Sequence, residues 1–116
     1  MKFTIDRKRW LRGEGSDKSF LLRPSDGKMC CLGFYALACG VSEWTITGAS
    51  LPRWAHTYPE HAQWLFGSRR SALCESPCET LAAINDDMFS ITTEAIREEK
   101  IVAVFAQYGV EVEFVD

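Results

Sequence analysis

The first half of the chain contains one stretch that is apolar without interruption. Met29 to Cys39 holds no charge and no proline across eleven residues, and Gly33 is its only glycine. A helix that is apolar on every side has to be buried on every side. The stretch is too short to cross a bilayer, which takes about 20 residues. It therefore predicts a central buried helix over Cys31–Cys39, ended by Gly40 in the left-handed conformation.

The C-terminal end carries the clearest periodicity. Thr93–Tyr108 has helical spacing, and Val110–Val115 alternates between apolar and polar residues like a strand with one solvated face. The inward face of this helix is predicted to contain Ile96, Ile101, Val104, Phe105 and Tyr108.

The N-terminal third predicts shorter elements. Phe3 and Ile5 alternate with polar neighbours, which indicates a short strand, and Asp6 can cap a brief helix over Arg7–Arg12. The turn sequence Pro-Ser-Asp-Gly then predicts a β-hairpin joining Phe20–Arg23 to Lys28–Cys30.

Serine and proline mark the starts of several short helices between these regions. The predicted starts lie near Ser42, Pro52, Pro59 and Pro77, and the last two helices end at Gly67 and Asn85. Together the elements predict a single α+β domain over residues 1–116. Its small, mainly antiparallel sheet packs against the central buried helix and the long C-terminal helix.

The charge is divided unevenly along the chain. Residues 1–28 hold eight Lys/Arg and four Asp/Glu, and residues 29–116 hold five and twelve, giving +4 and −7 of a net −3. The acidic body argues against direct nucleic-acid binding, although the basic N-terminal stretch keeps that reading open. Met1–Arg12 lacks the apolar region of a secretory signal, and no run is long enough to span a membrane. We expect a soluble intracellular protein.

Five cysteines, an odd number, argue against a disulfide scaffold. Cys30, Cys31 and Cys39 are predicted to be small hydrophobic core residues. The alternative is that Cys30 or Cys31, at a helix N-terminus, is a nucleophile with His56 or His61 as its base.

Two further motifs invite a metal. Cys74 and Cys78 could hold zinc if His56, His61 or another cysteine completed the four ligands, but the spacing differs from the common two-residue zinc knuckle. The Asn85-Asp86-Asp87 run lacks the ligand pattern of a calcium loop. We expect it to end a helix and to hydrogen-bond the Cys-Cys segment. No catalytic residue, metal ligand or cofactor is assigned.

Two stretches resemble a family of small uncharacterised bacteriophage and prophage proteins. They are Cys30-Cys31-Leu32-Gly33 and the downstream Leu81–Asp86, and the final helix and strand are also similar. The resemblance implies a phage origin, with the bacterial host's cytoplasm as the expected location, but no particular chemistry.

These observations favour a phage-encoded accessory protein that binds a host protein and inhibits a bacterial defence complex that processes nucleic acids. An acidic surface can occupy the basic groove of such a complex. The alternative is a small cysteine- or zinc-dependent enzyme. The candidate protein-binding residues are Trp54, Tyr58, Trp64, Glu94, Glu98, Glu99, Glu111 and Glu113.

Overall fold

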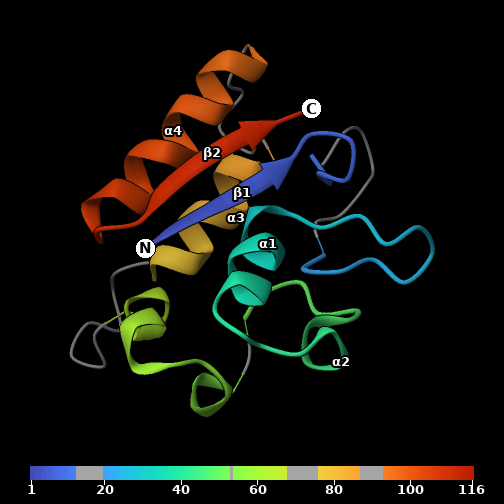
Figure 1. Cartoon of the computed structure of the whole chain (residues 1–116), viewed down its shortest axis with the longest axis vertical. Helices are drawn as coiled ribbons and strands as arrows, with labels where there is room; N and C mark the ends of the chain where they lie inside the picture. The colour runs from blue at the N-terminus through green and yellow to red at the C-terminus, as the bar shows by residue number, and fades with distance from the viewer. Residues whose placement is uncertain (13–19, 53, 68–75, 87–92) are drawn as a thin grey trace.

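Two strands from opposite ends of the chain pair across a group of helices (Figure 1). The computed structural model describes residues 1–12, 20–52, 54–67, 76–86 and 93–116. In chain order the elements are β1 (Lys2–Asp6), α1 (Cys31–Ala38), α2 (Glu43–Ile46), the 3₁₀ helices η1 (Ala55–Thr57) and η2 (Glu60–Phe66), α3 (Pro77–Asn85), α4 (Glu94–Gln107) and β2 (Glu111–Val115). None of the helices in these ranges is both long and apolar enough to cross a membrane.

The sheet among the described residues has two strands and is parallel, so the prediction of a mainly antiparallel sheet is wrong. Lys2 lies opposite Glu111, and the register continues to Asp6 opposite Val115. A parallel pair needs a long crossover connection. Here the connection contains nearly the whole chain, with α4 as its last helix.

The predicted hairpin turns back on itself without building a sheet. Arg23 N–H donates to the Lys28 carbonyl at 2.8 Å, as a reversal at Gly27 requires. The arms are joined again at their far ends, where Cys30 N–H donates to the Phe20 carbonyl at 3.0 Å. Between these two bonds the arms pair with other segments, because Met29 bridges Trp10 and Leu22 bridges Thr47, both in parallel. The hairpin therefore forms in part and adds no strand to the sheet of the described residues.

The predicted helix at Arg7–Arg12 is also wrong. The Asp6 carboxylate accepts from Lys8 N–H at 2.9 Å and the Asp6 carbonyl accepts from Arg9 N–H at 3.0 Å, which closes a turn. Leu11 N–H then donates to the Met29 carbonyl at 2.7 Å. Trp10 and Leu11 are both buried in this extended segment.

Helix α1 confirms the central buried helix. Gly40 has φ +88°, and Val41 N–H donates to the Ala36 carbonyl while Gly40 N–H donates to that of Leu37, both at 3.0 Å. These two bonds form the Schellman motif that ends many helices. Gly33 is also required, because a Cβ there would lie 1.8 Å from the Leu21 carbonyl oxygen.

An aromatic cluster joins four elements at the centre of the core. Phe3 of β1 lies 5.3 Å from Tyr35 of α1 and 5.0 Å from Phe105 of α4, measured between ring centroids. Trp64 of η2 contacts Tyr35 at 5.5 Å and Phe105 at 5.6 Å. Tilted and edge-to-face pairs at this spacing are the favourable arrangements for aromatic rings.

Helix α4 forms close to its predicted bounds, with the Thr93 hydroxyl accepting from Ile96 N–H at 3.1 Å. Its inward face is rotated relative to the prediction. Ile101 and Phe105 are buried, but Ile96 is exposed and Arg97 is buried in its place. Arg97 donates to the Asn85 carbonyl at 3.3 Å, because the C-terminal end of α3 needs hydrogen-bond donors.

The shorter helices follow the prediction in part. The Ser42 hydroxyl caps α2, and Gly67 ends η2, which winds as a 3₁₀ helix. Pro77 is in the first turn of α3, but the Ser76 hydroxyl contacts the Cys78 sulfur at 3.2 Å and makes no cap bond. The helix expected at Pro52 is wrong, because the first helical turn there begins only at Ala55.

Candidate functional site

Trp44 is the most exposed large apolar side chain in the described part of the chain. Its side chain is 91% exposed on α2, at the end of the molecule opposite α4 (Figure 1). The helix itself is well defined, because Ser42 accepts from Thr45 N–H at 3.3 Å and Ile46 is buried. Residues two apart in a helix point in directions that differ by about 200° around its axis. Because Ile46 points into the core, Trp44 points outwards.

Trp44 was not among the predicted protein-binding residues. The signal was present in Ser42 as a helix cap and in the apolar residues Val41 and Ile46, which anchor both ends of the helical turn. Trp44 lies between these anchors on the opposite side. An exposed tryptophan on an ordered helix is typical of a binding surface, because tryptophan is enriched at interface hot spots.

Of the three predicted aromatic anchors, Trp54, Tyr58 and Trp64, Trp54 is the one that lies exposed, at 56%. It has φ +52°, a left-handed conformation that is rare for a bulky residue. Its carbonyl accepts from both the N–H and the hydroxyl of Thr57 at 2.8 Å, which holds this conformation. Strain maintained in this way is found at binding and switch sites.

The other two predicted aromatic anchors are packed into the protein. Tyr58 is buried and lies edge-to-face with Phe66 at 5.4 Å. Trp64 belongs to the aromatic cluster and stacks on Tyr108 at 4.4 Å with an interplanar angle of 8°. Both rings therefore contribute area to the fold rather than to an open surface.

Most of the candidate acidic residues pair with the basic N-terminal stretch. Glu113 lies 2.9 Å from Lys2, Glu98 lies 2.7 Å from Arg7, and Glu94 lies 3.3 Å from Arg12. Three of the five candidate acidic residues are thus already paired within the molecule. Within the described ranges, Glu99 and Glu111 are exposed and take part in no ion pair.

Cys30 and Cys31 lie in the core rather than at a surface. Burial raises the pKa of the Cys30 thiol to about 12 and holds that of Cys31 well above its usual value. Thiols that stay protonated at neutral pH are poor nucleophiles. The position at the start of α1 does not offset this desolvation, and the packed-core interpretation of the pair is confirmed.

Asn85 organises the segment around these cysteines, as expected from the sequence. Its side-chain oxygen accepts from Cys31 N–H at 3.1 Å and from Trp10 Nε1–H at 2.7 Å. Its amide nitrogen donates to the Leu11 carbonyl at 2.8 Å. One buried amide thus joins α3, the start of α1 and the N-terminal turn.

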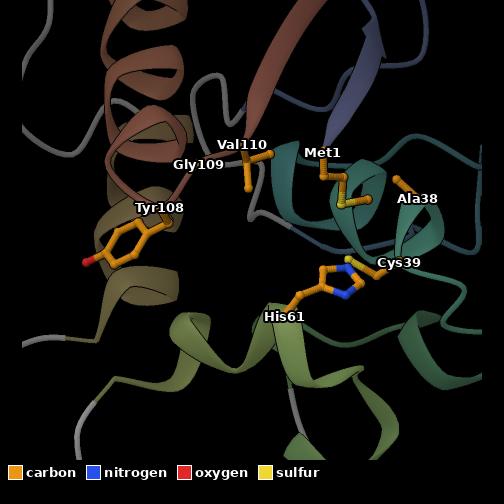
Figure 2. Close-up of a pocket in the computed structure, with 7 residues that line it drawn as sticks. All are labelled: Met1, Ala38, Cys39, His61, Tyr108, Gly109 and Val110. Carbon is orange, nitrogen blue, oxygen red and sulfur yellow. The ribbon is translucent and has the colours of Figure 1, made fainter.

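A pocket of about 360 Å³ opens where α1, η2 and the turn after α4 meet. Figure 2 shows Cys39, His61 and Met1 reaching into the same space, with the Tyr108 ring turned to the other side. Ala38, Gly109 and Val110 complete the lining. Pockets of this size accept small ligands or single side chains.

The Cys39 thiol lies one helical turn beyond a side-chain hydrogen bond behind this pocket. Trp64 Nε1–H donates to the Tyr35 hydroxyl oxygen at 3.1 Å, and Tyr35 precedes Cys39 by four residues at the end of α1. Burial raises the pKa of the Cys39 thiol, and its interaction with the Tyr35 hydroxyl partly opposes that rise. Cys39 also follows the last residue of α1, where the helix dipole disfavours a thiolate.

The proposed zinc ligands are only partly described. Cys74 lies outside the described residues, Cys78 is buried in α3, and His56 is exposed after Trp54. In the described ranges, no three side chains of His, Cys, Asp or Glu lie close enough together to share a metal ion.

Comparison of the chain with protein-family models, curated proteins and solved structures finds no match. The case for a function therefore depends on the side chains and their geometry.

Proposed function

We propose that this protein acts by binding another protein, with Trp44 as the main contact. The observation that carries the proposal is the 91% exposure of this side chain on a capped helix. Burying a tryptophan removes about 150–250 Å² from water. At about 25 cal/mol per Å², this is worth roughly 4–6 kcal/mol before the costs of association. The fold gains little of this energy, and a partner with an apolar pocket would gain most of it.

Trp54 supports a second contact. Its exposed ring follows α2 in the chain, and its left-handed backbone is held by Thr57. The two tryptophans present large rigid rings that lose little entropy when they become ordered.

We further propose that the partner is a bacterial host protein. The resemblance of Cys30–Gly33 and Leu81–Asp86 to phage and prophage proteins supports this choice. Inhibition of a nucleic-acid-processing defence complex remains the proposed consequence. Of the predicted acidic residues, Glu99 and Glu111 are exposed and unpaired among the residues that the structure describes, whereas Glu94, Glu98 and Glu113 already pair with cations. Glu99 and Glu111 belong to α4 and β2 rather than to the surface around Trp44, so they would act by long-range attraction to a basic partner.

The test compares Trp44→Ala with the wild-type chain in a pull-down from bacterial lysate, followed by identification of the retained protein and titration of the purified pair. We expect the variant to keep its melting temperature, because the ring packs against little of the fold. We expect its affinity to fall at least 30-fold, the loss of about 2 kcal/mol that defines a hot spot.

Trp64→Phe serves as a matched control, because it alters a tryptophan of the aromatic cluster rather than of the surface. It should lower the melting temperature and leave affinity nearly unchanged. Equal affinity of Trp44→Ala and wild type for the retained partner would contradict the proposal.

The cysteine-enzyme alternative has one observation in its favour, the shared pocket of Cys39 and His61. The raised pKa of Cys39 and its place at a helix C-terminus both oppose a free thiolate there. Protein binding therefore explains more of the structure than nucleophilic catalysis does.

A further inference from the structure

The pocket beside the aromatic cluster is lined by three side chains with a sulfur or nitrogen atom that can bind a soft metal ion. Cys39 supplies a thiol, His61 an imidazole and Met1 a thioether, and all three line the same cavity (Figure 2). The only side-chain oxygen in the lining is the Tyr108 phenol. Hard cations such as Mg²⁺ and Ca²⁺ require several oxygen ligands, so this lining does not suit them.

The helical register explains why Cys39 and His61 meet. Tyr35 and Cys39 are four residues apart, so they share one face at the end of α1. His61 and Trp64 are three residues apart on η2, and the 3₁₀ repeat aligns such residues on one face. Trp64 Nε1–H bonds to the Tyr35 hydroxyl at 3.1 Å, so the two faces are opposed. Cys39 shares a face with Tyr35 and His61 shares a face with Trp64, so the contact between Tyr35 and Trp64 also brings Cys39 and His61 to the same pocket.

The Tyr35 hydroxyl also favours the charged form of the sulfur. Its oxygen accepts from Trp64 at 3.1 Å, and its interaction with Cys39 acts to lower the pKa of that thiol. A polar group behind a thiolate stabilises the negative charge, as the groups behind metal ligands commonly do.

We propose that this pocket binds a single monovalent copper ion through the Cys39 sulfur, the His61 imidazole and the Met1 thioether. Thiolate and thioether ligands select Cu(I) among the common metals. A structural zinc site normally needs four ligands from Cys, His, Asp and Glu, and this lining provides two. Binding replaces the Cys39 S–H bond with a Cu–S bond and releases one proton, and no electron is transferred.

The test is an anaerobic titration of the full chain with Cu(I) in competition with a colorimetric chelator. We expect one equivalent to bind with release of one proton. The apparent affinity should rise about tenfold per pH unit while the free thiol is protonated, because one proton is displaced. Cys39→Ser should abolish the uptake, and His61→Gln should weaken it at least tenfold.

His56→Gln is the matched control, because His56 is exposed but does not line the pocket. It should bind Cu(I) like the wild type. Circular dichroism and melting curves establish that Cys39→Ser and His61→Gln are folded. Tyr35→Phe gives a second measurement, since loss of its O–H donor should weaken Cu(I) binding without removing a ligand. Absence of Cu(I) uptake by the wild type, equal uptake by Cys39→Ser, or an unchanged affinity in His61→Gln would overturn the proposal.

Discussion

At the scale of single residues, Asn85 determines how the N-terminal half is held. Its amide satisfies two buried donors, Trp10 Nε1–H and Cys31 N–H, and one buried carbonyl, that of Leu11. A buried polar group left without a partner costs about 1–3 kcal/mol. Asn85 is therefore worth more to stability than its size suggests.

Replacing Asn85 with alanine should lower the free energy of unfolding by about 3–5 kcal/mol, since several buried groups lose their partner together. Denaturant titration would measure the loss. Gln107→Ala removes an exposed amide from α4 and should change stability by less than about 0.5 kcal/mol. Similar stability of the two variants would show that Asn85 does not organise this segment.

At the scale of elements, the close contact between α1 and the chain at Leu21 depends on Gly33. A Cβ there would lie 1.8 Å from the Leu21 carbonyl oxygen and 2.8 Å from its carbon, so the backbone would have to move. Gly33→Ala should destabilise the protein by about 3 kcal/mol or more, as severe overpacking does. Thermal and denaturant unfolding would both report it.

The control at this scale is Ala38→Gly at the exposed last residue of the same helix, which should cost less than about 1 kcal/mol because the full helix-propensity difference applies to interior positions. Propensity favours alanine over glycine at both positions. If Gly33→Ala stabilised the protein, the packing of α1 against Leu21 would be misplaced.

Helices and strands that are marked by residues within their own sequence could be predicted. The segments with which they pair in the folded protein could not. The uncharged run to Cys39 and the glycine at Gly40 predicted α1, and strict alternation predicted β2. The choice of β1 as the partner of β2 depends on how the whole intervening chain packs, which alternation does not encode. The Pro24–Gly27 turn was identified and two bonds join its arms, but bridges to Trp10 and Thr47 take the place of a continuous ladder.

The candidate site divides in the same way. Exposure of Trp44 follows from local spacing and could have been predicted. The meeting of Cys39 with His61 depends on how η2 packs against the end of α1, which brings together residues 22 positions apart in the chain. The spacing of His61 and Trp64 places them on one face of η2, but it does not say which element that face will contact.

At the scale of the whole molecule, ion pairs fasten the basic N-terminal stretch to the acidic C-terminal elements. Arg7 is the centre of this contact, with two bonds to Glu98 at 2.7 and 3.0 Å and one to Asp116 at 3.1 Å. These hydrogen bonds raise the pKa of the Arg7 guanidinium, so the side chain stays charged throughout the working pH range. Planar two-point contacts of this kind are stronger than single ion pairs.

Arg7→Gln should lower the melting temperature, and the difference from wild type should shrink as salt is added, because salt screens partly exposed pairs. Adding Glu98→Gln to this variant should cause less loss than it does alone, since the pair is already broken. Lys8→Gln, at the exposed neighbouring position, is the control. Strict additivity of the two changes would show that Arg7 and Glu98 do not interact in solution.

The parallel pairing of β1 with β2 also orders events during synthesis. Lys2 lies opposite Glu111, so β1 cannot pair with β2 until the more than one hundred residues between them have been synthesised. Until then Phe3 lacks its contact with Phe105 of α4, and β1 exposes unpaired backbone groups on both edges. Contacts between residues so far apart in sequence also close slowly. The nascent chain therefore passes through a long interval with an adhesive N-terminal strand, in which protection by a chaperone would have its greatest effect.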